Sequence, residues 1–153
     1  MTIDQIKVVG NGGDVVWLVP PSVSYAAGVK TLTFTAVAQS MSDPKKGYEV
    51  YIQFLGVSPD EIVKNEQGEG RVSASTLRDK TCKVACHCKH YINGGCMKGN
   101  IEHHCNLVTN KQFWGYQRTT DNPNLVKNPN KEAWLCKHLA GLKDWILNDW
   151  ALQ

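Results

Sequence analysis

The sequence predicts an α+β fold with a small β-rich N-terminal half, a long loop held by a metal ion, and a C-terminal helix. Alternating and β-branched apolar runs occur mainly in the first half, and apolar residues near the end recur at three- and four-residue steps. Between them, cysteine and histidine residues flank a segment with little periodicity. With 153 residues we expect a single domain over 1–153, with a β-rich part at 1–79 and a metal-binding loop and helix at 80–153.

Three strands are expected in the first half of the chain. The run Asp14 to Val19 is short and β-branched, and Pro20-Pro21 is expected to end it. Thr31 to Ala38 alternates between apolar and threonine side chains, and Tyr48 to Leu55 has the strongest strand pattern of the chain. The segment Asp60 to Gly70 is mostly polar and contains two glycines, so we expect an exposed loop there.

A fourth strand is expected from Lys80 to Lys89. Because alternate residues of a strand share a face, Cys82, Cys86 and Cys88 are expected to lie on one side of it. That arrangement would present three thiols to the same neighbouring part of the molecule.

The segment from Asn93 to Asn130 is rich in Asn, Gly, Thr and Pro and has almost no apolar periodicity. Loops of this length are uncommon in compact domains unless something holds them, and we expect a bound metal to do so. An apolar stripe after it predicts a helix from about Lys131 to Trp150, with Asn130 as its N-cap. The stripe consists of Leu135, Leu139, Leu142 and Ile146.

Two closely spaced ligand pairs predict a metal site. The pairs are Cys86-His87-Cys88 and Cys136-Lys137-His138, and they offer three thiolates and one imidazole, the ligand types that a structural zinc ion prefers in a closed tetrahedron. Residues two apart on a helix are separated by about 200° around its axis. Cys136 and His138 can therefore reach one ion only if Cys136 lies before or at the start of the helix, which would move that start to roughly Leu135.

Other cysteines and histidines leave alternatives open. The reserve ligands are Cys82, Cys96, His104 and Cys105, which could form a second site or replace members of the first. Any one of the cysteines could instead be a small buried apolar residue. A set of four thiols such as Cys86, Cys88, Cys105 and Cys136 could hold an iron–sulfur cluster. We favour zinc because histidines lie among the thiols and the common ferredoxin spacings are absent.

Composition and motifs exclude several function classes. The net charge of +3 and the pI near 8.5 are too mild to argue for nucleic acid. No apolar stretch is long enough to span a bilayer, and the start has no signal-peptide pattern, so we expect reduced thiols. The sequence contains no Gly-rich phosphate loop, no His-Glu-x-x-His and no deaminase pattern. We therefore expect a protein that is not an enzyme, with no small-molecule substrate.

The ligand pairs resemble a known motif. Cys-x-Cys followed at a distance by Cys-x-His is similar to the SWIM zinc-binding motif, represented here by Cys86-His87-Cys88 and by the run from Cys136 to Ala140. The last 75 or so residues, taken together, resemble more specifically a group of tailed-bacteriophage virion proteins. In these proteins a β-strand runs into Cys-x-Cys and a variable Asn-rich loop follows. After the loop come an Asn-Pro, then Cys-Lys-His-Leu and an apolar helix.

The matching residues here are Val84 to Cys88, Asn122-Pro123, Asn128 to Asn130, and Leu135 to Leu142. The chain departs from that pattern after Cys88, where Lys89 to Cys96 replaces an aromatic-rich stretch, and in the additional cysteines and histidines of the loop. The resemblance implies a structural component of the virion, in the tail, baseplate or neck, assembled in the host cytoplasm with other virion proteins as partners. Its metal would then stabilise the fold.

Three further hypotheses remain as alternatives. The first is a SWIM-like zinc module that binds nucleic acid or a protein partner, since basic and aromatic residues accompany the cysteines in sequence. The second is an iron–sulfur version of the same structural protein. A metalloenzyme or thiol enzyme that uses a spare cysteine or histidine is a third hypothesis. For the main hypothesis we expect neither a membrane nor nucleic acid as a partner.

Overall fold

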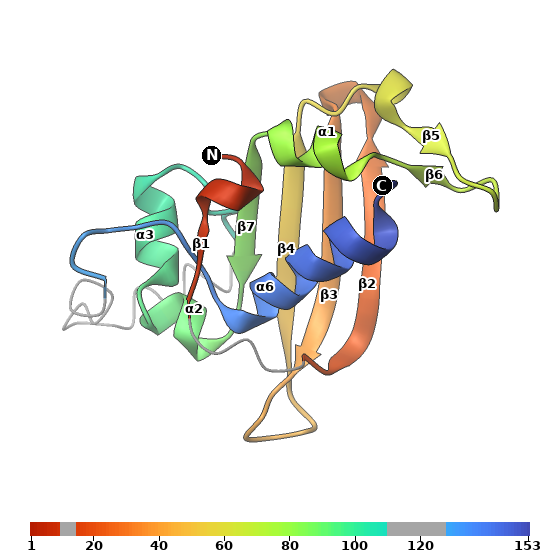
Figure 1. Cartoon of the computed structure of the whole chain (residues 1–153). Helices are drawn as coiled ribbons and strands as arrows, with labels where there is room; N and C mark the ends of the chain where they lie inside the picture. The colour runs from red at the N-terminus through yellow and green to blue at the C-terminus, as the bar shows by residue number, and fades with distance from the viewer. Residues whose placement is uncertain (10–14, 110–127) are drawn as a thin grey trace.

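A computed structural model describes residues 1–9, 15–109 and 128–153 of the chain. Its centre is a four-stranded antiparallel sheet in the order β2-β3-β4-β7 (Figure 1). The strands are β2 (Trp17–Ala26), β3 (Thr31–Gln39), β4 (Gly47–Leu55) and β7 (Cys82–Cys86). With helices packed on this sheet, the α+β prediction is confirmed.

Strands β3 and β4 follow their sequence pattern. Buried and half-buried residues alternate along both, so that the alternation predicted for β3 sets one face toward the core. Phe34 pairs with Ile52 and Leu32 with Phe54, and all four side chains are at most 3% exposed. These pairs form the part of the sheet on which the C-terminal helix packs.

Strand β2 corrects the first strand prediction. The strand does not end at Pro20-Pro21 but continues through both prolines to Ala26, with register shifts between Trp17 and Ser22. It lies at the edge of the sheet and neither proline pairs with a residue of β3, so the missing N–H groups remove no ladder hydrogen bond. Residue 14, the expected start, is outside the described residues.

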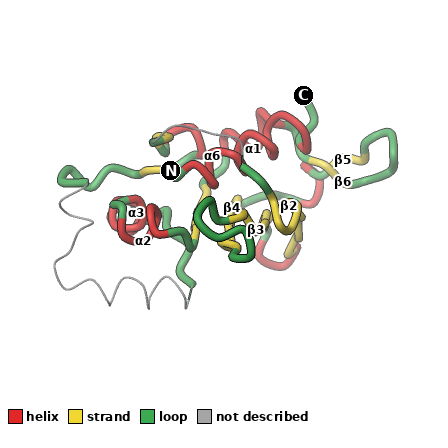
Figure 2. The backbone as a smooth tube through the Cα atoms, turned by 90° about the horizontal axis from the view of Figure 1, so that it is seen from below, coloured by secondary structure: helices red, strands yellow, loops and turns green. Residues whose placement is uncertain are grey.

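The C-terminal segment crosses one face of the sheet. It consists of α6 (Lys137–Asp144) followed by η4 (Trp145–Trp150), a π-helical turn, and Figure 2 shows α6 and α1 (Ala74–Asp79) on the same side of the strands. Phe34 meets Trp145 and Trp150 with ring centroids 6.3 and 4.8 Å apart. Edge-to-face contacts of this kind add to the apolar burial that holds the helix on the sheet.

The predicted helix start at Lys131 and the predicted N-cap Asn130 are wrong. Just before α6 the backbone forms β8 (Trp134–Leu135), which pairs in parallel with β1 (Lys7–Val8). The N–H of Lys7 donates to the Ala133 carbonyl at 3.0 Å and the N–H of Val9 to the Leu135 carbonyl at 3.1 Å. Since these residues are extended and paired with the N-terminal segment, the helix begins only after them, at Lys137.

The region after β7 is more ordered than expected. The predicted strand from Lys80 to Lys89 is confined to Cys82–Cys86, and the chain then forms α2 (Lys89–Asn93) and α3 (Cys96–Glu102). The predicted loop from Asn93 to Asn130 is therefore partly helical, and its residues 110–127 lie outside the described part.

Buried asparagines connect this region to the rest of the fold. The side-chain amide of Asn100 donates to the Trp134 carbonyl at 2.8 Å and to the Tyr91 hydroxyl at 3.2 Å, while its oxygen accepts from the Trp134 N–H at 2.8 Å. Asn128 likewise donates to the carbonyls of Gly95 and Glu132. These amides satisfy backbone groups that a buried loop would leave unpaired.

Short elements complete the chain. The segment expected as a loop at 60–70 forms a small hairpin of β5 (Val63–Lys64) and β6 (Gly70–Arg71). Three 3₁₀ turns are η1 (Ile3–Gln5), η2 (Ala27–Val29) and η3 (Pro59–Glu61). Among the described residues, no helix has the length and apolar character needed to cross a membrane.

Candidate metal centre

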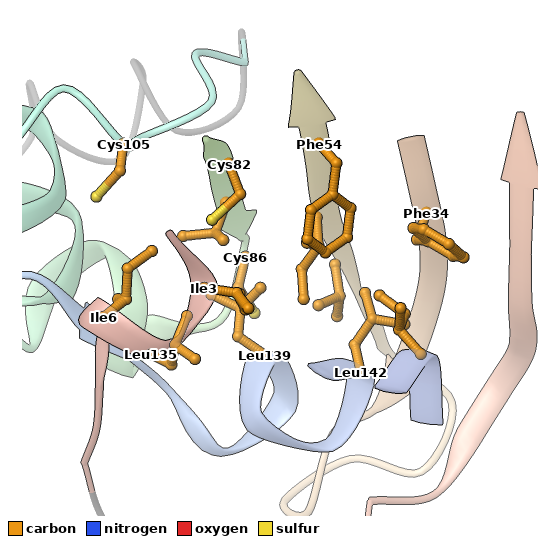
Figure 3. Close-up of a cluster of buried hydrophobic side chains, with 14 of the residues drawn as sticks. Ile3, Ile6, Phe34, Phe54, Cys82, Cys86, Cys105, Leu135, Leu139 and Leu142 are labelled. Atoms are coloured by element: carbon orange, nitrogen blue, oxygen red, sulfur yellow. The ribbon is translucent and has the colours of Figure 1, made fainter. Parts of the chain in front are cut away.

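The four predicted ligands lie where three elements begin or end. Cys86 is the last residue of β7, Cys88 is the N-cap of α2, Cys136 is the N-cap of α6, and His138 lies in the first turn of α6. Figure 3 shows Cys86 on the side of β7 that faces Leu139 of α6. The sheet and the helix packed on it therefore bring the two ligand pairs together.

The four side chains form one compact buried group. One ligand atom from each of Cys86, Cys88, Cys136 and His138 lies within 4.8 Å of all the others, and no side chain is more than 5% exposed. The Cys86 Sγ lies 3.7 Å from the His138 Nδ1. A tetrahedral ion with metal–sulfur bonds of about 2.3 Å and metal–nitrogen bonds of about 2.0 Å sets ligand atoms about 3.5–3.8 Å apart. This Cys₃His group could therefore hold a metal ion.

The local geometry of Cys136 satisfies the condition that the helix periodicity imposes. Cys136 is extended, with φ −71° and ψ 171°, and α6 begins at the next residue. Because Cys136 precedes the helix, its sulfur and the imidazole of His138 can point to one place although two helical residues at this spacing could not. The start at Lys137 lies two residues beyond the expected Leu135.

Cys88 reaches the group by a different route from the one expected. It was predicted to continue the strand face of Cys82 and Cys86, but the strand ends at Cys86 and Cys88 caps α2. The N–H of Tyr91 donates to the Cys88 sulfur at 3.3 Å. A backbone N–H at a helix N-terminus favours a thiolate, which is the form that binds metal.

The three thiols have different electrostatic environments. Burial raises the pKa of Cys86 and of Cys136 well above the usual thiol value. Hydrogen bonds from Cys136 and Cys86, with further ones from His138 and the Tyr91 N–H, lower the pKa of Cys88. Without a cation, the Cys88 thiolate thus accepts hydrogen bonds from the protonated thiols of Cys86 and Cys136. A divalent ion would remove the cost of burying the other two negative charges.

None of the four reserve ligands belongs to this group. Cys82, Cys96 and Cys105 are fully buried elsewhere, and burial is the main cause that raises their pKa to about 12, 12 and 11. They are neutral thiols in apolar surroundings and pack as small apolar side chains. His104 is exposed after α3, with a positive φ of 58°. Within the described residues, the four form no second group of ligand atoms, so the alternatives of a second site and of a replacement ligand find no support.

A pocket of about 400 Å³ adjoins the group. Cys88, Cys136 and His138 line it, whereas Cys86 does not. Its lining also includes the basic residues Lys89, His90 and Lys137. Three of the four candidate ligands can therefore be approached from this side, which offers a path for a metal ion to enter.

Sequence reasoning missed the polar cluster on the opposite side of β7. The His87 Nδ1 lies 3.2 Å from a Glu49 carboxylate oxygen, and its Nε2 lies 2.7 Å from the Thr109 hydroxyl. Tyr51 donates to the same carboxylate at 2.8 Å. Strand alternation predicts that His87 points away from Cys86 and Cys88. Only the pairing of β7 with β4 shows that Glu49 and Tyr51 lie next to it.

No protein-family model matches the chain, and comparisons with curated proteins and with solved structures find no match either. The site is therefore described by its own geometry.

Proposed function

We propose that this chain is a non-catalytic structural protein in which Cys86, Cys88, Cys136 and His138 hold one zinc ion. The observation that carries the proposal is the close mutual distance of four buried ligand atoms. Four protein ligands occupy all the coordination positions of a tetrahedral zinc ion and leave none for water or substrate. This is the pattern of structural rather than catalytic zinc sites. The ion would connect the end of β7 to the start of α6.

The geometry favours a single ion over an iron–sulfur cluster. In a cluster the cysteines bind different iron atoms, so the ligand sulfurs stand farther apart than around one ion. Ligand atoms that all lie within 4.8 Å of one another suit one ion. A histidine among three cysteines is also a common composition of structural zinc sites.

Following the resemblance of the last 75 or so residues, we place this structural protein in the virion of a tailed phage, in the tail, baseplate or neck. A bound ion adds its binding free energy to that of folding, which suits a small subunit that must stay folded in an assembly. In this proposal the partners are other virion proteins, and no chemical reaction is assigned to the metal.

Metal analysis of the purified protein tests the metal centre. We expect one zinc ion per chain and a colourless protein, and replacement by cobalt should give the strong visible bands of a tetrahedral thiolate complex. A brown protein with iron and acid-labile sulfide would establish the iron–sulfur alternative instead. Less than half an equivalent of any metal after purification and reconstitution would reject the site.

Mass spectrometry of purified particles tests the virion role. In a phage that carries this gene, the chain should be found at a constant ratio to the major capsid protein, and a deletion should give defective particles. Its absence from purified particles would refute this role while leaving the metal centre untouched.

A SWIM-like module that binds nucleic acid is the second candidate. Lys89, His90 and Lys137 line the pocket beside the ligand group and are available to contact phosphates. Binding to short DNA or RNA that weakens steeply with salt would favour this function. No binding at low salt would end it.

A further inference from the structure

A second pocket lies on the same C-terminal segment as the ligand group but involves none of its residues. It has a volume of about 280 Å³ and is lined by the start of β2, the end of α6 and η4. Trp17 and Trp145 supply aromatic surface, and Asp144, Asn148 and Asp149 supply polar groups. Unlike the pocket beside the ligand group, its lining contains no lysine, arginine or histidine.

The π-helical turn explains why two carboxylates share this pocket. Residues five apart in an α-helix point about 140° away from each other. In η4 the N–H of Ala151 donates to the Ile146 carbonyl five residues earlier, at 2.8 Å, so the turn is wider. Asp144 and Asp149, also five apart, consequently line the same cavity.

Gly141 brings the second tryptophan to the pocket. A Cβ atom at this position would lie only 2.8 Å from a Val15 methyl carbon, so glycine allows the segment before β2 to lie against α6. Trp17 thereby reaches the same pocket as Trp145. The cavity thus combines aromatic surface with negative charge, and it is built by two segments far apart in sequence.

The carboxylates of the pocket are available for a ligand. Within the described part of the chain, neither Asp144 nor Asp149 takes part in any of the ion pairs or side-chain hydrogen bonds found. Indole faces attract cations, and a planar guanidinium both stacks on an indole and donates paired hydrogen bonds to carboxylates. An ammonium group, which is more strongly hydrated, gains less from the indole surface.

We propose that this pocket binds the guanidinium group of an arginine side chain presented by a neighbouring protein. The lining argues against free arginine as the ligand, because a free amino acid would bring its own carboxylate next to two aspartates with no basic residue to pair with it. The inference does not depend on the metal centre or on the virion role, since none of the four candidate ligands lines this pocket.

An NMR titration of the full chain with N-acetyl-L-arginine amide tests the inference. We expect saturable shifts of the indole N–H signals of Trp17 and Trp145, which the variant Trp17→Phe assigns. N-acetyl-L-lysine amide should bind at least about twofold more weakly, and the neutral citrulline analogue more weakly still. Absence of saturation up to about 100 mM would overturn the proposal.

Charge variants distinguish binding in the pocket from non-specific attraction of the cation to negative charges on the surface. Asp144→Asn and Asp149→Asn should each weaken binding of the arginine amide about two- to fivefold. Asp79→Asn removes the same charge from an exposed residue of α1 and should leave binding unchanged. Equal effects of all three substitutions would overturn the proposal, as would tighter binding of free arginine than of the blocked amide.

Discussion

The sulfur of Cys86 lies 3.7 Å from the Nδ1 atom of His138, although 52 residues separate the two in sequence. The first ends a strand of the central sheet and the second lies in the first turn of the helix that crosses it. An ion between them would connect the sheet to the helix at the point where the N-terminal segment also pairs with β8. Loss of the ion should therefore affect the packing of the whole C-terminal segment.

Removal of one candidate ligand should abolish metal binding. We expect Cys136→Ala to lose the ion, to become sensitive to protease and to lose at least about 3 kcal/mol in free energy of unfolding. Cys105→Ala is the matched control, because Cys105 is equally buried but outside the ligand group. It should keep one equivalent of metal and lose only about 1–2 kcal/mol. Metal content and chemical denaturation measure both effects.

A Cys136→Ala protein that retains a full equivalent of metal would show that the ligands are assigned wrongly. Loss of metal from both variants would point instead to a general collapse of this region.

Metal binding should release protons. Burial keeps the pKa of Cys86 and Cys136 high, whereas hydrogen bonds lower the pKa of Cys88, so at neutral pH the metal-free group holds two thiol protons. We expect release of about two protons per ion. Because protons and metal compete for the same sulfurs, affinity should rise with pH and fall on acidification. Calorimetry in buffers of different ionisation enthalpy measures the number, and release of no protons would contradict this description.

The buried amide of Asn100 should be essential for the region around α3. Asn100→Ala removes its bonds to Tyr91 and to both backbone groups of Trp134, which leaves a part-buried N–H unpaired. We expect a loss of about 2–3 kcal/mol in free energy of unfolding. Tyr91→Phe removes a hydroxyl that also donates to the Val84 carbonyl and to the Asn106 side chain, so we expect a comparable loss. Thermal unfolding of the two variants measures both losses, and an Asn100→Ala protein as stable as the parent would refute the prediction.

Two glycines should differ in how much stability falls when each is replaced by alanine. A Cβ atom at Gly99 would overlap the Glu132 carbonyl oxygen, whereas nothing lies within 4 Å of a Cβ atom at Gly28. Although alanine favours helices, we expect Gly99→Ala to lose about 2 kcal/mol or more. Gly28→Ala should change stability by less than about 0.5 kcal/mol. Denaturation midpoints test the pair, and equal midpoints would show that α3 does not pack closely on the segment at Glu132.

The strands that could be predicted are those with one face in the core and the other face partly exposed to solvent. β3 and β4 each bury alternate residues, so their pattern of period two marks them nearly to the residue. The start of α6 could not be found in this way. The apolar stripe begins at Leu135, but that residue is buried in β8, paired with β1 near the start of the chain. A contact over that separation in sequence leaves no local signal.

The sequence predicts a loop that a bound metal holds, because the composition of this segment lacks periodicity. Its asparagines, which indicated an irregular loop, instead bond to buried backbone groups through Asn100 and Asn128. A polar side chain has the same local pattern whether it faces water or a buried carbonyl, so sequence cannot tell the two apart.

The sequence by itself determined the fold class, the central strands and the four residues of the candidate site, because alternation and the spacing of ligand pairs are local properties. Only the tertiary structure decided that Cys136 ends an extended segment, that Cys82, Cys96 and Cys105 stay outside the ligand group, and that Asp144 and Asp149 line one pocket. Each of these depends on which distant segment packs against the residue, since burial and pairing select one backbone conformation among several that the local sequence allows.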